Sequence, residues 1–587
     1  MNTRFFIKII VLWVFTGAYS GIFAQQGQIL LKIGTTTDIH GAYFPNDWYT
    51  GKPIAGSLSQ VYTWAQEQRH VPGQTLILLD NGDLVQGDPA AYYSNAVDIH
   101  KPNIAARILN FMGYEAASVG NHDMETGHLV YDQLAREYRF PWLMANGVSL
   151  ITGEPVFKPY TILEHAGIRI GILGITTPKI PDWLPPALWS GLEFRGMVET
   201  AKKWSEYILT QEKPDILIGL FHAGVDATYG NQSIDDPLNE NASEWVARKV
   251  PGFQIIFVGH DHKSWNFKVA DPNGDSVLIL GSVSRAAEIA VASITLKKQD
   301  NQDNRYRITS VTGTHQKIKD YPPDPEFMKK FSGYIDTIQQ YVDQPVGTIT
   351  RRITADDAYF GPSAFVSLIH RAQLDLTGAD VSFTAPLSFR SELAPGILTV
   401  KDLFRLYRFE NQLYTIQLTG AEIAGYLNYS YSIWMKTMTG PDDLMLNMEQ
   451  QKDGSWKLKN AYYNFDSAAG IDYIVDLSKP AGQMVTITQM SNGQPFNLNK
   501  NYTVALNSYR GSGGGNHLRL GAGLSKEAIT GRLIRASEKD FRLLFTEWVR
   551  KQRTIDPVAL QNWKTVPEPW ILVAAPRDAQ RLFKERN

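Results

Sequence analysis

Histidine, aspartate and asparagine recur directly after short apolar segments in the first half of this 587-residue chain. Five segments lead into the groups Asp38-Ile39-His40, Asp80-Asn81-Gly82-Asp83, Gly120-Asn121-His122-Asp123, Phe221-His222-Ala223-Gly224 and Gly259-His260-Asp261-His262. Imidazoles favour zinc, iron or nickel, and carboxylate and amide oxygens suit manganese or magnesium, so this mixed set suits several divalent cations. An aspartate between two cations can bridge them at roughly 3.5–4 Å, the spacing of two-metal hydrolases. The pattern therefore predicts a hydrolytic site with two divalent cations.

The segments before these groups are typical of buried strands in a layered α/β domain. They are Ile29–Ile33, Thr75–Leu79, Ala116–Val119, Ile216–Leu220 and Ile255–Val258, and stretches with helical spacing alternate with them. Ligands of open α/β sheets bind outside the carboxyl ends of the strands, so the five groups are expected to converge. One strand-end histidine is more often structural than a ligand. Five of the chain's 12 histidines lie in these groups, which favours metal binding.

The overall composition excludes several classes of protein. With 43% hydrophobic and 20% charged residues, the chain has the composition of a globular protein. The formal net charge of −2 argues against a nucleic-acid polymer as partner, because such a partner requires a concentrated basic face. The absence of cysteine excludes disulfides, thiolate nucleophiles, cysteine-ligated zinc and a lipid anchor on an N-terminal cysteine.

Residues 1–24 have the layout of an export signal. Arg4 precedes the apolar stretch Phe5–Phe15, and small residues follow up to Ala24. The apolar stretch is shorter than the roughly 20 residues that a membrane span needs. An uncleaved anchor is the alternative. We expect an exported soluble protein of the periplasm or cell envelope, without an integral membrane segment after signal removal.

The remaining chain is expected to form two domains, within the two to four that its length suggests. Residues 28–320 are predicted to form the first and residues 346–587 the second. A Pro-rich break precedes a predicted helix, Pro325–Val342, so residues 321–345 are expected to link the domains. Near the end of the chain, Glu538–Gln552 also has helical spacing.

The motifs DIH, NGD, GNHD, the segment around His222 and GHDH, in this order, resemble those of the calcineurin-like metallophosphoesterases. The second half resembles the C-terminal substrate domain of 5′-nucleotidases and 2′,3′-cyclic-nucleotide 2′-phosphodiesterases. The resemblance implies an α/β fold class, with an N-terminal four-layer calcineurin-like β-sandwich flanked by helices. A helix would join it to a C-terminal α+β substrate-binding domain.

The resemblance also implies roles for the site residues. One divalent ion would be held by Asp38, His40, Asp83 and His262, and the other by Asp83, Asn121, His222 and His260, with Asp83 bridging. Zinc, manganese, iron, magnesium and cobalt all remain open. His122 would be the catalytic histidine that is not a ligand. Glu125 stands where many 5′-nucleotidases have the aspartate that orients this histidine, and Asp123 is the alternative partner.

In the second domain, the resemblance points to substrate contacts. Phe465 and Tyr509 fall at the positions of two aromatic residues that stack on the base. Arg390 matches an arginine that holds phosphate, although without the resemblance a surface salt bridge would be its expected role. The family's GGDG signature reads Gly513-Gly514-Gly515-Asn516 here, so Asn516 replaces an aspartate that commonly binds ribose hydroxyls.

These expectations together describe a phosphohydrolase that acts on small nucleotides by attack of a metal-bridged hydroxide. It would be a 5′-nucleotidase, a 2′,3′-cyclic-nucleotide 2′-phosphodiesterase with 3′-nucleotidase activity, or both. The segments LLDNGDLVQGDP and RLYRFENQLYTIQLTG resemble the cyclic-phosphodiesterase branch. The alternatives are a sulfur-ester or nucleotide-sugar hydrolase on the same scaffold and a non-catalytic nucleotide-binding protein.

Overall fold

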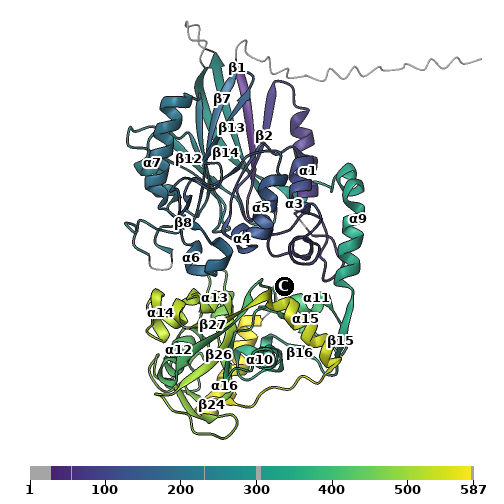
Figure 1. Ribbon diagram of the computed structural model, residues 1–587, viewed down its shortest axis with the longest axis vertical. Helices are drawn as coiled ribbons and strands as arrows, with labels where there is room; N and C mark the ends of the chain where they lie inside the picture. The colour runs from purple at the N-terminus through teal and green to yellow at the C-terminus, as the bar shows by residue number, and fades with distance from the viewer. Residues whose placement is uncertain (1–27, 55, 230–231, 299–305, 584–587) are drawn as a thin grey trace, which may run out of the picture.

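A computed structural model describes residues 28–54, 56–229, 232–298 and 306–583. The predicted export signal lies outside these described residues. Within them, no helix combines the length and the apolarity that crossing a bilayer requires. The chain forms two domains stacked end to end, and the helix α9, Pro325–Val342, connects them along one flank (Figure 1).

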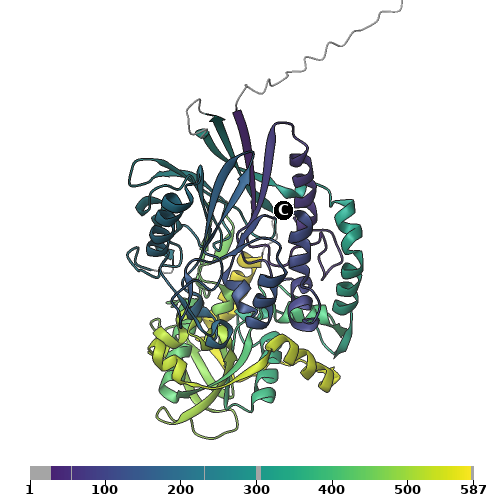
Figure 2. The same cartoon turned by 45° about the horizontal axis from the view of Figure 1, so that its top comes forward.

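Helix α9 occupies the residues predicted for it. Asp324 caps its first turn by accepting a hydrogen bond from the backbone N–H of Phe327 at 2.8 Å, and Pro325 stands at the first helical position. Phe327 and Phe331 pack into the core of the first domain, so α9 lies beside α1, Leu58–Arg69 (Figure 2). This packing fixes the connector against one domain.

Two six-stranded sheets form the centre of the first domain. The first sheet has the order β14 (Tyr306–Lys317), β13 (Glu288–Lys298), β1 (Gln28–Thr36), β2 (Gln74–Asp80), β3 (Ala116–Ser118) and β4 (Trp142–Leu143). The second has the order β11 (Trp265–Ala270), β12 (Ser276–Gly281), β10 (Ile255–Val258), β9 (Ile216–His222), β7 (Ile168–Thr176) and β6 (Tyr160–His165). Aliphatic side chains from both sheets, including Leu31, Ile33, Ile170 and Ile218, form the core between them.

Helices cover the outer face of each sheet. On the first sheet lie α1, α3 (Ile104–Met112) and α5 (His128–Glu137), and on the second lie α7 (Met197–Tyr207) and α8 (Ser243–Lys249). The order helix, sheet, sheet, helix confirms the predicted four-layer arrangement. The strands β1, β2 and β3 run parallel, as do β7, β9 and β10, so within each sheet their carboxyl ends meet at one edge.

The second domain has the predicted α+β character. Its largest sheet has the order β23 (Ser467–Ala469), β17 (Val381–Thr384), β26 (Asn501–Asn507), β20 (Gln412–Thr419) and β27 (Leu533–Asp540). Helices α10 (Ala364–Thr377), α12 (Gly420–Trp434), α15 (Phe541–Gln552) and α16 (Glu568–Phe583) surround it. The prediction of a helix from Glu538 is wrong at its start, because residues 538–540 complete β27. Asp540 then caps α15 through the N–H of Leu543.

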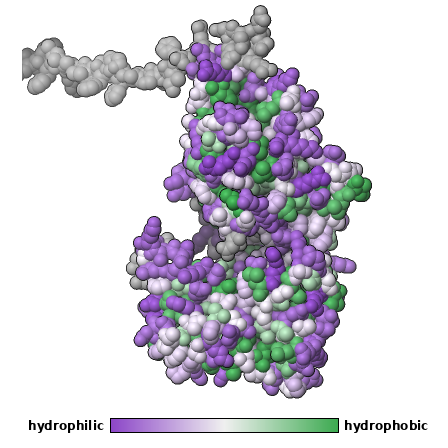
Figure 3. Space-filling model, turned by 90° about the vertical axis from the view of Figure 1, so that its left-hand side faces the viewer, coloured by the Kyte–Doolittle hydropathy of each residue, from purple (hydrophilic) through white to green (hydrophobic). Residues whose placement is uncertain are grey.

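The two domains touch through polar contacts and through aromatic packing, such as that of Tyr92 on Phe404, beside the cleft between them. Tyr92 Oη donates to Asp540 Oδ2 at 2.8 Å, and Lys526 Nζ lies 2.5 Å from Asp182 Oδ1. The surface is indented where the domains meet (Figure 3). The backbone N–H of Gly87, in the loop that follows β2, donates to Glu410 of the second domain, so the carboxyl-end groups of the first domain lie on the side that faces the second.

Candidate metal centre

The structure brings the predicted ligand groups together in two clusters. Asp38, His40 and His262 form the first, and Asp83, His222 and His260 form the second. Within each cluster, the potential ligand atoms all lie within 4.8 Å of one another. His260 and His262 are separated by one residue but belong to different clusters, as the turn at Gly259 allowed.

Short distances define the first cluster. His40 Nε2 lies 3.1 Å from His262 Nε2, and His262 Nε2 lies 3.3 Å from Asp38 Oδ1. Asp38 is completely buried, whereas the His262 side chain is nearly half exposed. One side of this cluster is therefore open to the cleft.

The second cluster includes Asn121. His222 Nε2 lies 3.1 Å from both Asp83 Oδ2 and Asn121 Oδ1, and His260 Nδ1 lies 2.9 Å from the same Asn121 oxygen. The other oxygen of Asp83, Oδ1, accepts a hydrogen bond from the backbone N–H of His122 at 2.8 Å. Asp83 also acts on His40 in the first cluster. Burial has the largest effect on the pKa of His40 and lowers it, the charge of Asp83 raises it, and the net pKa is about 4.

The backbone is strained at most of these ligands. Asp38, His40, Asp83, His260 and His262 all have positive φ angles, between 49° and 72°. Side chains with a Cβ rarely adopt this left-handed region, and each such residue costs on the order of 1–3 kcal/mol. Such strain is typical of functional sites, because the fold holds the side chains in position at the expense of local backbone stability.

Two histidines of the clusters, His40 and His222, direct Nδ1 to a backbone carbonyl. Nδ1 of His40 donates to the carbonyl of Gln86 at 3.2 Å, and Nδ1 of His222 donates to the carbonyl of Asn81 at 2.6 Å. This fixes the ring orientation and leaves Nε2 directed into the cluster.

His260 is held by two residues that the sequence analysis missed. Its Nε2 donates to Glu240 Oε1 at 3.2 Å, so Nδ1 faces Asn121. The Trp183 ring stacks on its imidazole, with 5.3 Å between ring centroids. No motif marks Glu240 or Trp183, because each lies 20 or more residues from His260 in the sequence.

The electrostatics of the second cluster fit a divalent cation. Burial is the largest single effect and lowers the pKa of His222, but the charge and hydrogen bond of Asp83, together with Asp38 and the Asn81 carbonyl, raise this pKa to about 10. Conversely, burial raises the pKa of Asp83, while His222 and His122 bring it well below its usual range. The Asp83 carboxylate is thus already balanced by the positive charge of the neighbouring imidazoles. The imidazole, carboxylate and amide donors of the cluster suit zinc, iron, manganese or magnesium.

His122 has an unambiguous partner in the structure. Its Nδ1 donates to Glu125 Oε2 at 2.7 Å, one turn along the short helix α4, Asn121–Glu125. Burial lowers the pKa of His122, but the charges of Asp83 and Glu125 raise it to about 9. Asp123, the alternative partner, does not contact the His122 ring, because the buried Asp123 accepts from the backbone N–H groups of Gly120, Asp83 and Leu84.

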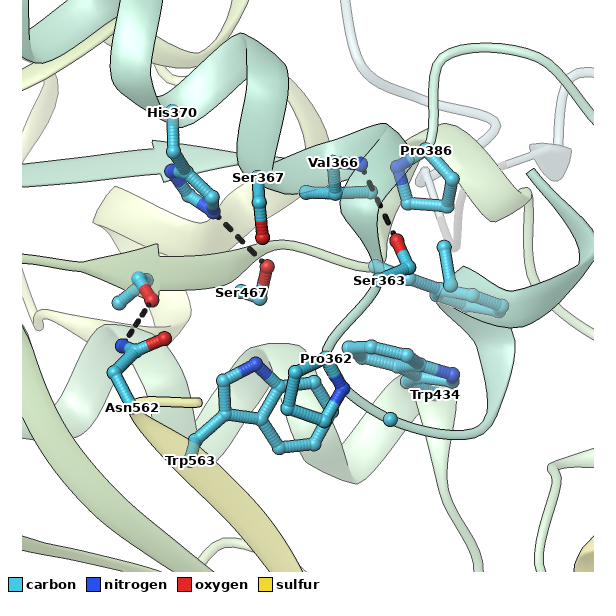
Figure 4. Close-up of a pocket in the computed structure, with 14 residues that line it drawn as sticks. Pro362, Ser363, Val366, Ser367, His370, Pro386, Trp434, Ser467, Asn562 and Trp563 are labelled. Atoms are coloured by element: carbon cyan, nitrogen blue, oxygen red, sulfur yellow. Dashed lines mark hydrogen bonds between the residues drawn. The ribbon is translucent and has the colours of Figure 1, made fainter. Parts of the chain in front are cut away.

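The prediction that Phe465 stacks on a base is contradicted by its burial. Its side chain is 0% exposed and lies parallel to Trp434, with 5.5 Å between ring centroids. Both rings line a core cavity of about 10 Å³, into which His370 and Trp563 also project (Figure 4). Phe465 therefore has no free face for a nucleotide base.

Tyr463, two residues earlier, is a better candidate for this role. Burial raises its pKa to about 12, and the next largest contributions come from Tyr509 and Tyr229. Tyr463 and Tyr509 are half-buried and Tyr229 is exposed, so each keeps ring surface on which a base could stack. The repeated tyrosine of the segment Ala-Tyr-Tyr-Asn-Phe was the available sequence signal.

Arg390 and Asn516 lie in the second domain without contacting the metal clusters. Arg390 Nε is 3.7 Å from Asp356 Oδ2, and its guanidinium lies over the ring of Phe583 at 5.4 Å. Asn516 is exposed and has a positive φ of 65°. Without the family resemblance, a surface salt bridge was the expected role of Arg390. The structure contains such a salt bridge, between Arg390 and Asp356.

Comparison with known proteins agrees with this architecture. Residues 31–264 match the calcineurin-like phosphoesterase family, and residues 345–520 match the 5′-nucleotidase C-terminal domain family. The chain is 25% identical to a 2′,3′-cyclic-nucleotide 2′-phosphodiesterase/3′-nucleotidase of Haemophilus influenzae, over 97% of this chain and 92% of that protein.

Two further matches differ in extent. The trifunctional nucleotide phosphoesterase protein YfkN of Bacillus subtilis is 25% identical over 92% of this chain, which spans only 39% of that longer protein. A Staphylococcus aureus structure of a proposed 5′-nucleotidase with alpha-ketoglutarate superimposes with a TM-score of 0.73. The superposition covers 91% of this chain and 99% of the Staphylococcus aureus chain. The two sequences are 18% identical, so the match shows a shared fold.

Proposed function

Because this chain belongs to the calcineurin-like phosphoesterases that carry a 5′-nucleotidase C-terminal domain and is a metal-dependent phosphoric ester hydrolase, we propose that it removes phosphate from nucleotides. The proposed substrates are nucleoside monophosphates and 2′,3′-cyclic nucleotides. The convergence of two ligand clusters at the edge that faces the second domain carries this proposal. We further propose that residues 1–24 direct its export to the periplasm or cell envelope.

The chain's own residues would divide the work as follows. Asp38, His40 and His262 would hold one divalent cation, His222, His260 and Asn121 the other, and Asp83 would lie between them. The cations would supply Lewis-acid activation of water and neutralise phosphate charge.

His122 would act on the phosphoryl group from beside the clusters. Glu125 holds Nδ1, so His122 presents Nε2–H, and its side chain is 35% exposed. This proton could be donated to a phosphoryl oxygen or to the leaving oxygen. The ring lies 5.4 Å from that of His40, which places it next to the first cluster.

We propose that Tyr463 and Tyr509 hold the base. Replacing Tyr463 by alanine is expected to raise KM for a nucleotide about 5- to 150-fold, since one base stack contributes about 1–3 kcal/mol. Phe465→Ala is the matched control: it is expected to leave KM unchanged and to lower the free energy of unfolding by about 3–5 kcal/mol. Steady-state kinetics and thermal unfolding of both variants measure this difference. A raised KM in Phe465→Ala alone would restore the original assignment.

Hydrolysis assays on matched substrates test the proposed function. Phosphate release from 5′-AMP, and from 2′,3′-cyclic AMP with separation of the products, should be measured with Mn²⁺, with Zn²⁺ and with a chelator. We expect turnover of at least one substrate with metal and none with chelator. The substrate that is turned over assigns the chain to the 5′-nucleotidase or the cyclic-phosphodiesterase branch. Inactivity on both substrates, with metals bound, would refute the nucleotide proposal.

A further inference from the structure

Glu410 extends from the second domain to the loop that orients a metal-cluster histidine. Its Oε1 accepts a hydrogen bond from the backbone N–H of Gly87 at 3.3 Å. The preceding residue, Gln86, holds His40 through its carbonyl, and Gly87 packs directly against the His40 side chain. Glu410 therefore lies at the wall of the cleft, next to the first cluster.

The same segment also reaches the aromatic residues proposed to hold the base. Phe409, the neighbour of Glu410, packs on Tyr463 with 5.7 Å between ring centroids. In a nucleotide, the sugar lies between the phosphate and the base. Glu410 lies between the metal cluster and Tyr463, and it is therefore positioned beside the sugar.

The Glu410 carboxylate is only partly satisfied by the protein. Arg542 Nη1 lies 3.9 Å from Oε1, too far for a hydrogen bond, and this nitrogen has no hydrogen-bond partner among the described residues. In the described chain, Oε2 of Glu410 accepts no hydrogen bond, although its side chain is only 13% exposed. Oε2 is not one of the described chain's fully buried polar atoms without a partner, so it keeps contact with solvent and a ligand in the cleft can reach it.

The chemistry of a nucleotide limits what that donor can be. A phosphate group is an acceptor and repels a carboxylate, and the base is assigned to the tyrosines. The remaining donors are the hydroxyl groups of the ribose. Resting on the proposed function above, we propose that Glu410 accepts a hydrogen bond from the free 2′- or 3′-hydroxyl of a nucleoside monophosphate and so selects ribonucleotides among these monophosphates. This would provide the sugar contact that the replacement of aspartate by Asn516 removes.

Substrate pairs that differ only in sugar hydroxyls test this inference. The pairs are 3′-AMP with 2′-deoxy-3′-AMP, and 5′-AMP with 2′,3′-dideoxy-AMP. They should be assayed on wild type, Glu410→Ala, Glu410→Gln and the control Glu392→Ala. Glu392 is half exposed and pairs with Arg352, away from the Gly87 contact. Thermal unfolding verifies that every variant is folded.

We expect wild type and Glu392→Ala to prefer the ribonucleotide about 10- to 100-fold in kcat/KM. In Glu410→Ala this preference should fall to nearly one, through loss of activity on the ribonucleotide alone. Glu410→Gln keeps an acceptor oxygen and should retain part of the preference. An equal loss on both members of a pair in Glu410→Ala would overturn the inference and assign Glu410 to domain contact. Wild type inactive on all four compounds and on 2′,3′-cyclic AMP would instead overturn the proposed function.

Discussion

Replacement of His122 by alanine is expected to lower kcat by about 10²- to 10⁴-fold, the usual contribution of a positioned proton donor. His122 lies beside both clusters but contributes no ligand atom to either, so the metal content should stay unchanged. Steady-state kinetics together with elemental analysis of the purified variant measure both quantities. His165→Ala is a suitable control, because His165 lies at the end of β6 and pairs with Glu115. Full activity of His122→Ala would remove this residue from the mechanism.

The pH profile of a second variant tests the same proton. Glu125 contributes to raising the pKa of His122, so Glu125→Gln should lower that pKa. If protonated His122 is required, activity at alkaline pH falls as the pH rises through this pKa. The alkaline limb should therefore move to lower pH in Glu125→Gln. An unchanged alkaline limb would show that another group controls it.

Replacement of Asp466 by asparagine is expected to lower the free energy of unfolding by about 3–5 kcal/mol. Arg510 donates to Asp466 through Nε at 2.9 Å and through Nη2 at 3.0 Å, and the two side chains are only 2% and 4% exposed. The substitution would leave the guanidinium buried without its countercharge. Chemical denaturation of the variant measures this effect.

The exposed pair of Arg351 and Asp556 provides the control. It has a similar two-bond geometry but is more than half exposed, so Asp556→Asn should change stability by less than about 1 kcal/mol. Equal losses in Asp466→Asn and Asp556→Asn would contradict the argument from burial. Burial is the largest single effect and raises the pKa of Asp466, but Arg510, His517 and Tyr426 together lower this pKa below its usual value. The stabilisation is therefore present above the unfolded-state pKa near 4 and is lost as the pH falls below it.

The sequence predicted the metal clusters because strand order and ligand type are local signals. Each candidate ligand follows an apolar segment, and parallel strands bring such positions to one edge. The choice between Glu125 and Asp123 depends on side-chain direction in a five-residue helix, where the residue three positions on shares the face of His122.

The substrate domain was harder to predict, since burial decides which aromatic residue is free. Tyr463 and Phe465 are two residues apart, and the turn Tyr462–Asn464 places one at the cleft and the other in the core. Glu240 and Glu410 act across long sequence separations. No local pattern encodes their contacts with His260 and Gly87.

The left-handed backbone of five predicted ligands has a practical consequence for protein engineering. Removing a ligand such as Asp38 or His262 by alanine keeps a Cβ in a conformation that disfavours it. Glycine deletes the same donor atoms and adopts this conformation freely. Glycine variants at these positions are therefore the better starting point for a metal-free, substrate-trapping form of the protein for co-crystallisation.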